Sequence, residues 1–337
     1  MKKIIAICLS LVMLLGLVAC GSEKSVANGT EGGEKLRIAF IPQLIGIPYF
    51  TAMEEGGKQA AAELGCEFMY VGATEANAAE QSRLMDSLIK QDVDAISVSV
   101  LDSSSINPML KKAQDAGINV FTSDSDSATS VRELYVAQAL DKDLGYTLID
   151  TLADEIGGAG KIGIVSGEAT ATNLNTWIDY MQERMDEKYP DMEVVDIRYT
   201  VGGSSEDTLK QAQELMVKNE DLKAIIAVAS SNIAGACQAV EQAGKIGEVT
   251  VIGYGSPATV KPYMDKGIMK NSILWDAKAL GYLTCWAGVQ LASGVEFQEE
   301  NQVPGFEQPV KYFADDHILL LGDPLVITPE NVADFDF

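Results

Sequence analysis

Short apolar segments alternate with amphipathic segments through most of this 337-residue chain. In the first half the apolar segments are Leu36–Ile41, Cys66–Val71, Ala95–Val100 and Asn119–Thr122, and segments with helical spacing fill the intervals between them. Buried strands that alternate with helices form a parallel sheet with helices on both faces, connected by right-handed crossovers. The pattern therefore predicts an α/β fold.

The same alternation continues in the second half of the chain. The predicted strands are Lys161–Ser166, Val194–Tyr199, Ala224–Ala229, Val249–Gly253 and Asn271–Leu274, and Gly117, Gly244 and Gly267 each follow a helical segment where a left-handed residue ends a helix. The stretch from Leu36 to Phe337 is about twice the length of a typical domain, so two lobes are expected. The later segments Ala277–Ala292 and Ile318–Leu321 allow a return crossing between the lobes.

The amino terminus has the pattern of a bacterial lipoprotein signal. Lys2 and Lys3 precede the apolar run Ile4–Val18, which leads into small residues and Cys20. The run is shorter than the roughly 20 apolar residues of a membrane-spanning helix, which argues against a transmembrane anchor. We therefore predict a signal peptide over residues 1–19, a lipid on the Cys20 sulfur and a flexible tether over residues 20–35. The protein is then held by its lipid anchor on the outer face of the cytoplasmic membrane, or in the periplasm.

Charge and cysteine content exclude several classes of partner. The formal net charge of −24 opposes binding to nucleic acid or to an anionic membrane surface, so the lipid is the only expected contact with the membrane. Cys8 leaves with the signal peptide, and the remaining thiols are Cys66, Cys237 and Cys285. Their number and spacing fit neither a disulfide framework nor a metal site, and their apolar surroundings predict buried thiols.

Polar and aromatic residues gather in the loops that follow the predicted strands. Ligands of open parallel sheets bind beyond the carboxyl ends of the strands, so these loops form the candidate site. The candidates are Gln43, Tyr49, Phe50, Asp124, Asp126, Asn173, Asn175, Trp177, Ser230, Ser231, Asn232, Tyr254, Trp275 and Asp276. Carboxylates, amides and hydroxyls bind sugar hydroxyls, aromatic faces cover the C–H side of a sugar ring, and no cation belongs to this set. An uncharged polyhydroxy ligand is therefore expected.

Several candidates have an alternative structural role. Asp126, Ser231 and Asn232 are also good helix-capping residues, whereas Phe50 and Trp177 also suit a hydrophobic core. Asp124 directly follows an apolar strand and is the strongest carboxylate candidate.

The sequence offers little for catalysis. His317 is the only histidine, and no motif pairs it with a serine or cysteine nucleophile. The segment Gly157–Lys161 lacks the spacing of a phosphate loop, and Ile162 stands where Ser or Thr would bind magnesium, so we interpret it as a helix-ending turn. Two carboxylates such as Asp124 and Asp276 leave glycosidase chemistry open, because their separation is not readable from sequence. We predict no catalytic residues, no cofactor and no metal.

The chain from Leu36 to Phe337 resembles the type I substrate-binding lipoproteins of sugar ABC transporters, within the group of rhamnose-binding and autoinducer-2-binding proteins. The matching stretches are Ile47–Phe50, Ala52–Lys58, Thr122–Asp126, Asn173–Trp177, Leu280–Thr284 and Leu319–Leu325. The resemblance implies a type I periplasmic-binding-protein fold, with two doubly wound parallel-sheet lobes joined by a hinge and a ligand cleft between them. It implies a first lobe over residues 36–137 plus about 276–313, and a second over 138–275 plus about 314–337. It also implies delivery of the ligand to ABC permease subunits, and a monomer is expected because it suits this delivery.

The residues distinguish the two ligand types of this group. Autoinducer-2-binding proteins typically place Lys where this chain has Gln43, Asp-Gln where it has Asn173–Leu174, and Pro and Ala where it has Val228 and Ser230; only Asp124 agrees. Loss of the lysine and of one carboxylate changes the charge and the hydrogen-bonding groups of the pocket. A deoxyhexose such as rhamnose is therefore the expected ligand. The alternative is an autoinducer-2-binding protein that serves uptake or presents its ligand to a membrane sensor for signalling.

Overall fold

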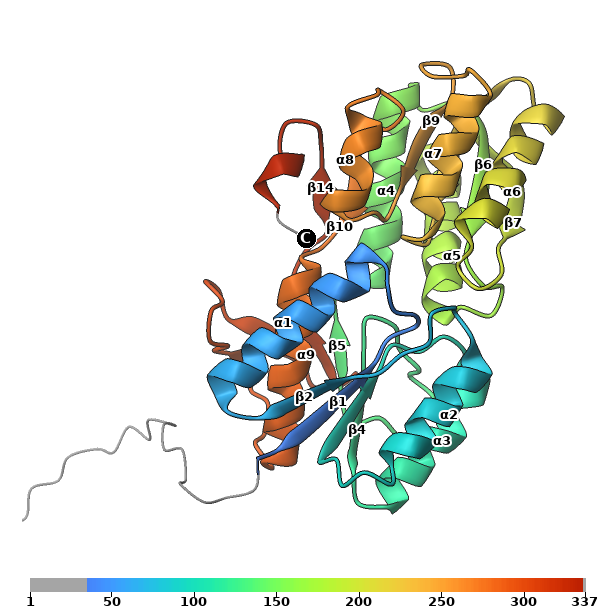
Figure 1. The fold of residues 1–337 in the computed structure, drawn as a ribbon. Helices are drawn as coiled ribbons and strands as arrows, with labels where there is room; N and C mark the ends of the chain where they lie inside the picture. The colour runs from blue at the N-terminus through green and yellow to red at the C-terminus, as the bar shows by residue number, and fades with distance from the viewer. Residues whose placement is uncertain (1–34, 336–337) are drawn as a thin grey trace, which may run out of the picture. The chain divides into compact units, whose positions relative to one another are not determined.

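The computed structural model describes residues 35–335 (Figure 1). The predicted signal peptide, the lipidation site at Cys20 and the tether up to residue 34 lie outside the described residues and stay predictions. Within residues 35–335, no helix is both long and apolar enough to cross a membrane.

The first lobe is built on an eight-stranded sheet with the strand order β11-β12-β13-β5-β4-β3-β1-β2. The strands are β1 Arg37–Ile41, β2 Glu67–Tyr70, β3 Ala95–Val98, β4 Asn119–Ser123, β5 Tyr135–Ala137, β11 Glu300–Asn301, β12 Val310–Phe313 and β13 Ile318–Leu320. Those from β13 to β2 pair in parallel, whereas β11 and β12 pair antiparallel at one edge. The predicted parallel sheet is confirmed.

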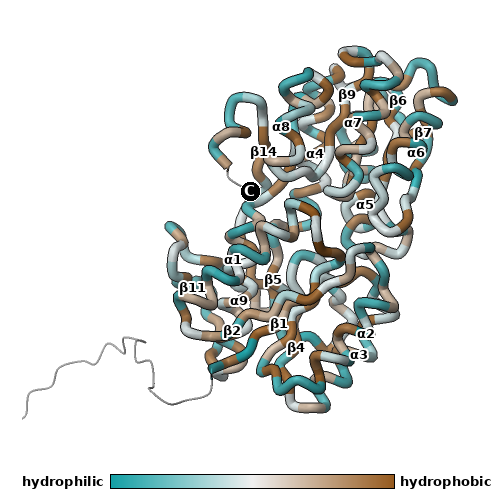
Figure 2. The backbone as a smooth tube through the Cα atoms, in the orientation of Figure 1, coloured by the Kyte–Doolittle hydropathy of each residue, from teal (hydrophilic) through white to brown (hydrophobic). Residues whose placement is uncertain are grey.

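Helices cover both faces of this sheet, as the continuous apolar strands predict (Figure 1). The helices are α1 Pro48–Leu64, α2 Ala78–Leu88, α3 Ser103–Asp115 and α9 Ala277–Ala292. In β1, Ile38 and Phe40 belong to the core beneath α1 and α9, whereas Ala39 and Ile41 belong to the core beneath α2 and α3. Alternate residues of one buried strand therefore serve two apolar layers, and Figure 2 shows hydrophobic residues gathered along the strands.

The second lobe is built on a four-stranded parallel sheet with the order β7-β6-β8-β9. Its strands are β6 Gly160–Ser166, β7 Met192–Tyr199, β8 Leu222–Ala227 and β9 Thr250–Gly253, and its helices are α4 Asp141–Ile156, α5 Thr172–Lys188, α6 Ser205–Lys218, α7 Asn232–Gln242 and α8 Pro257–Met264. Beside it, β10 Ser272–Leu274 pairs antiparallel with β14 Leu325–Ile327, and a single bridge from Tyr254 to Ile273 joins this pair to the end of β9. A short 3-10 helix, Val332–Asp334, follows.

The chain passes between the two sheets three times. It crosses after β5, again at Trp275–Asp276 between β10 and α9, and a last time between β13 and β14. The predicted lobe boundary near residue 313 separates β12 from β13, although these strands pair in the first sheet. We therefore propose that the last crossing lies after Leu320.

The helix ends agree with their sequence signals. Gly117, Gly244 and Gly267 all have positive φ, as expected for glycines that end helices. Gly157 has φ 81 and ends α4, which confirms the predicted helix end, but the turn covers only Gly157–Ala159, because β6 already begins at Gly160.

Candidate ligand-binding site

A cavity lies at the carboxyl ends of the strands of both sheets. It encloses about 590 Å³ of empty space, including open solvent at its mouth. Its lining consists of Gln43, Leu44, Ile47, Tyr49, Phe50, Ala76, Leu101, Asp124, Gly167, Glu168, Ala171, Asn173, Leu174, Trp177, Gly203, Val228, Ala229, Ser230, Ser231, Tyr254 and Trp275. Within residues 35–335, no lysine or arginine contributes to this lining.

Asp124 provides a carboxylate in the wall of the cavity. It follows β4 with φ 69, a left-handed conformation that is uncommon for a residue other than glycine. One carboxylate oxygen accepts a 2.5 Å hydrogen bond from the Tyr49 hydroxyl, and the other accepts one from the Ser99 hydroxyl. Burial raises the pKa of Asp124 to about 6, while the two hydrogen bonds oppose this rise. A carboxylate has about four acceptor sites, so it has capacity left for a ligand hydroxyl.

Aromatic side chains from both lobes form much of the cavity wall. The Trp177 ring lies 4.7 Å from that of Tyr254 and 5.8 Å from that of Trp275, centroid to centroid. The indole N–H of Trp275 donates to the Tyr49 hydroxyl at 2.9 Å, and that of Trp177 donates to Asp141 at 2.7 Å. Because both indoles are anchored by hydrogen bonds, their faces are held in fixed orientations.

Amide and hydroxyl groups enter the cavity from both lobes. The Gln43 amide donates to the Val100 carbonyl at 3.0 Å and lies 3.4 Å from the Asn173 side-chain oxygen of the second lobe. Ser230 donates to the Tyr254 carbonyl at 2.8 Å. The Tyr254 hydroxyl is buried without a hydrogen-bond partner among the described residues, and burial raises the pKa of Tyr254 far above its usual range. It is therefore a neutral hydroxyl available to a ligand.

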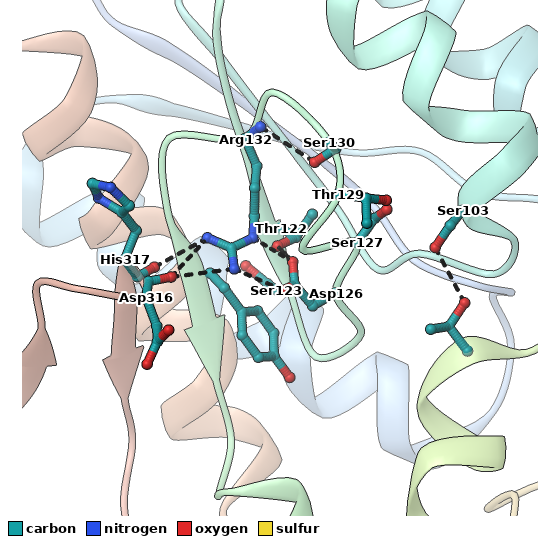
Figure 3. Close-up of polar contacts among 12 residues, drawn as sticks. Ser103, Thr122, Ser123, Asp126, Ser127, Thr129, Ser130, Arg132, Asp316 and His317 are labelled. Carbon is teal, nitrogen blue, oxygen red and sulfur yellow. Dashed lines mark hydrogen bonds and ion pairs between the residues drawn. The ribbon is translucent and has the colours of Figure 1, made fainter.

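The two lobes also touch around the rim of the cavity. Ser103 at the start of α3 and Thr172 at the start of α5 have their hydroxyl oxygens 3.2 Å apart, a contact drawn in Figure 3. The Ala76 N–H of the first lobe donates to the Gly202 carbonyl of the second at 3.4 Å. These contacts join the two lobes directly.

The comparison with family models decides what kind of protein has this architecture. The model described as "Periplasmic binding protein domain" matches residues 38–296. The chain belongs to the periplasmic binding protein family. The two-lobed α/β fold with a cleft at the strand ends, inferred from the sequence resemblance, is thereby confirmed.

Known proteins similar to this periplasmic binding protein include sugar-binding proteins. The D-ribose/D-allose-binding protein of Pseudomonas aeruginosa is 29% identical over 262 residues, which cover 74% of this chain and 81% of that protein. LsrB from Clostridium saccharobutylicum, solved in complex with AI-2, superposes with a TM-score of 0.85 at 26% identity and covers 90% of this chain and 100% of its own. An ABC transporter solute binding protein from Clostridium phytofermentas with bound L-rhamnose has a TM-score of 0.83 at 27% identity, covering 89% and 98%.

Asp126, a sequence candidate, does not line the cavity of this periplasmic binding protein. Its carboxylate pairs with the Arg132 guanidinium at 2.6 Å and accepts a hydrogen bond from Thr122 (Figure 3). Arg132 also donates to the backbone carbonyls of Asp316 and His317 at 3.3 Å. The Asp126 side chain is therefore used to attach the β4–β5 connection to the start of β13.

Asn175 and Asn232 also point away from the cavity. Asn175 donates to the Ala169 carbonyl at 2.9 Å, which holds the loop before α5. Asn232 is fully buried and donates to the hydroxyls of Thr200 and Thr208. Neither residue is in the cavity lining, and only the Asn232 amide satisfies interior hydroxyls of the second lobe.

Two further residues have structural positions. Asp276 caps α9 by accepting from the Ala279 N–H at 2.8 Å and lies outside the cavity lining. His317 has φ 53, and its Nδ1 atom lies 3.0 Å from the Tyr312 hydroxyl, again outside the cavity. The remaining candidates, namely Gln43, Tyr49, Phe50, Asp124, Asn173, Trp177, Ser230, Ser231, Tyr254 and Trp275, all line it.

Sequence reasoning overlooked Glu168 and Asp141. Glu168 lies two residues after the end of β6, lines the cavity and accepts a hydrogen bond from the Gly202 N–H. The same strand-end rule that selected the other loops also selects this one. Asp141 supports Trp177 from behind, and burial raises the pKa of Asp141. No local signal marks it, because its partner lies 36 residues further along the chain.

Proposed function

We propose that this protein is the substrate-binding lipoprotein of a sugar ABC importer and that it captures a deoxyhexose-like sugar, with rhamnose as the first candidate. The observation that carries the proposal is the chemistry of the cavity. The lining contains the buried carboxylate of Asp124, the half-buried one of Glu168, two amides, several hydroxyls and five aromatic side chains, and no described lysine or arginine. Such a lining suits a neutral ligand with hydroxyls on its edge and C–H groups on its faces.

Individual residues are assigned to parts of the ligand. Asp124 accepts from ring hydroxyls, and Gln43 and Asn173 offer amide donors and acceptors from opposite lobes. The indole of Trp177 covers a ring face, and the Tyr254 hydroxyl donates to a ligand oxygen. Each hydrogen bond to a charged group contributes about 1.5–3 kcal/mol, so a few of them give micromolar or tighter binding.

Closure of the cleft couples binding to delivery. A ligand that contacts both lobes binds the closed arrangement more tightly than an open one and shifts the population toward it. The proposed partner of the closed form is the permease of the importer, and a monomer is sufficient for this role. The lipidated Cys20 would keep the protein at the outer face of the membrane.

Autoinducer-2 is the alternative ligand. It is favoured by the likeness to LsrB, which was solved in complex with AI-2, and by the aspartate at Asp124. The five residues at which this chain departs from the autoinducer-2 pattern all line the cavity, namely Gln43, Asn173, Leu174, Val228 and Ser230. Because the differences fall where a ligand would be contacted, they support the sugar over autoinducer-2.

We propose no enzymatic role. Asp276, the carboxylate that left glycosidase chemistry open, caps α9 outside the cavity, which removes it as a partner for Asp124. Chromatography of candidate sugars and glycosides after incubation with the protein should show the starting material alone. A new product would contradict a pure binding role.

The first experiment measures thermal unfolding with rhamnose, fucose, ribose, xylose, galactose and autoinducer-2, followed by calorimetry on each compound that raises the midpoint. A ligand that binds only the native state raises the midpoint by mass action. We expect rhamnose or a near relative to do so. If only autoinducer-2 raises the midpoint, autoinducer-2 and not a sugar is the ligand. If no compound raises it, the proposed ligand class is wrong.

A further inference from the structure

Two cysteines 219 residues apart in sequence meet inside the first lobe. Cys66 lies between the end of α1 and the start of β2, and Cys285 lies in the middle of α9. Their sulfur atoms are 3.7 Å apart. Cys285 is fully buried, and Cys66 is 9% exposed. Cys237, a third buried thiol, belongs to α7 of the second lobe.

Helix packing holds these sulfurs in place. A Cβ atom on Gly56 of α1 would lie 1.8 Å from the Lys278 carbonyl oxygen, and one on Gly281 of α9 would lie 2.0 Å from the Met53 carbonyl oxygen. The backbones of α1 and α9 therefore pass in direct contact, which only glycine at these positions permits. Cys285 is on α9 and Cys66 follows the last residue of α1 by two positions, so the packing of this helix pair brings the two thiols together.

We propose that Cys66 and Cys285 form a disulfide bond when the protein is exposed to an external disulfide oxidant. The Cys66 thiolate attacks the oxidant, whose S–S bond breaks to give a mixed disulfide and one free thiol. The Cys285 sulfur then attacks Cys66 in the mixed disulfide, the second oxidant thiol leaves, and a Cys66–Cys285 S–S bond forms. The two cysteines lose two protons and two electrons, and the oxidant leaves as two thiols. The sulfurs must approach by less than about 2 Å to reach bonding distance. The proposed location outside the cytoplasm supplies conditions in which such a bond persists, and in this respect the inference rests on the proposed function.

The bond would reinforce the lobe without touching the cavity. Tyr49 and Phe50 at the amino end of α1 line the cavity, whereas Cys66 follows the opposite end of this 17-residue helix. At 1.5 Å per residue the two ends are about 25 Å apart. The bond closes a very long loop of chain, which is the condition for a large restriction of the unfolded state. We therefore expect oxidation to raise stability and to leave ligand affinity within about twofold.

The test maps the thiols of the purified protein after refolding in a glutathione redox buffer. Trypsin places the three cysteines on separate peptides, residues 59–83, 224–245 and 279–311. We expect a linked pair of peptides 59–83 and 279–311 that is 2 Da lighter than their sum, and an unlinked peptide 224–245. Absence of the linked pair, or equal linkage to the Cys237 peptide, would overturn the proposal.

Matched variants separate the bond from other effects of reduction. Reduction should lower the thermal midpoint of the wild type and of Cys237→Ser by about 5 °C or more. Cys66→Ser and Cys285→Ala should show no such fall, and a fall that persists in both contradicts the assignment. Ligand calorimetry on oxidised and reduced wild type keeps this test separate from the proposed function. Failure to bind any sugar leaves the peptide map interpretable, and a missing bond leaves the sugar titration interpretable.

Discussion

Tyr49 and Asp124 share a 2.5 Å hydrogen bond in the cavity wall, although they come from different strand-helix units of the first lobe. The Tyr49 hydroxyl in turn accepts from the Trp275 indole at the second crossing between the lobes. The carboxylate, a phenol and an indole therefore form one connected chain of hydrogen bonds. A ligand bound to Asp124 is linked through this chain to the segment where the lobes meet.

The carboxylate of Asp124 should be required for affinity. Asp124→Asn replaces a charged acceptor by a neutral amide, and a hydrogen bond to a charged group contributes more than about 1.4 kcal/mol. We expect at least about tenfold weaker sugar binding by calorimetry, with a folded protein by circular dichroism. Asp126→Asn is the matched control, because Asp126 lies two residues away but pairs with Arg132 outside the cavity. Its affinity should stay within about threefold, and equal losses in both variants would contradict the assignment.

Binding should weaken in mild acid. Burial raises the pKa of Asp124 to about 6 in the folded protein, against about 3.9 for an unfolded aspartate. A ligand hydroxyl that donates to the carboxylate favours the ionised form, so protonation competes with binding. In calorimetry, the affinity for the sugar should not change with pH above about pH 7. Below pH 6 it should fall by up to about tenfold for each pH unit. Asp124→Asn should remove most of this pH dependence. If the affinity of this variant falls with pH as steeply as that of the wild type, another titrating group causes the dependence.

The same raised pKa makes a prediction for stability without ligand. The pKa of Asp124 is higher in the folded than in the unfolded protein, so protonation of Asp124 stabilises the fold. This contribution to the free energy of unfolding is complete below about pH 4 and is lost as the pH rises through 6. A shift of about two units corresponds to about 3 kcal/mol. Urea unfolding at pH 4.5 and 7.5 should therefore show Asp124→Asn gaining stability relative to wild type at the higher pH. If Asp124→Asn gains no stability relative to wild type at pH 7.5, the ionised carboxylate of Asp124 does not destabilise the folded protein.

The fold could be predicted because each unit carries its own signal. Apolar runs of four to six residues between amphipathic segments predicted β1 to β4 and β6 to β10, and the prediction of Ala277–Ala292 coincides with α9. The strands β5, β11, β12 and β14 were missed, because each has two to four residues and none lies in the regular alternation of strand and helix that identified the others. Helix α4 was missed as well. Its buried residues include Leu144, Leu148 and Leu152, whose spacing of four residues is a helical signal in the sequence that the prediction overlooked.

The candidate site could be predicted by position but not by side-chain direction. The strand-end rule selects the loop that contains both Asp124 and Asp126, yet only Asp124 faces the cavity. The Asp126 carboxylate accepts a hydrogen bond from Arg132, which also lies between β4 and β5 and donates to the Asp316 carbonyl just before β13. These partners come from distant parts of the sequence, so no local pattern distinguishes the two aspartates.

Tryptophan emission should report ligand binding. The chain has three tryptophans, of which Trp177 and Trp275 line the cavity and Trp286 packs against Phe297. A sugar in the cavity would contact the first two rings and change their emission. We expect Trp286→Phe to keep the full change and Trp177→Phe or Trp275→Phe to lose part of it. A change lost only in Trp286→Phe would place the ligand elsewhere.

The hydrogen bond from Trp177 to Asp141 should stabilise the second lobe. Trp177→Phe leaves the half-buried Asp141 carboxylate without its 2.7 Å indole donor. A buried acceptor that loses its partner costs about 1–3 kcal/mol, which urea unfolding resolves. Adding Asp141→Asn removes the buried charge and should recover part of the loss. Additive effects of the two substitutions would show that the residues do not interact.

The contact between α1 and α9 should tolerate no side chain at Gly281. A methyl group there would lie 2.0 Å from the Met53 carbonyl oxygen, a backbone atom that cannot rotate away. Gly281→Ala must separate the helices and should cost about 3 kcal/mol or more in urea unfolding. Gly322→Ala is the matched control, because nothing lies within 4 Å of its added carbon, and it should change stability by less than about 0.5 kcal/mol. Since α1 also carries Tyr49 into the cavity, a folded Gly281→Ala protein should bind sugar more weakly, whereas unchanged stability and affinity would mean that the helices separate freely.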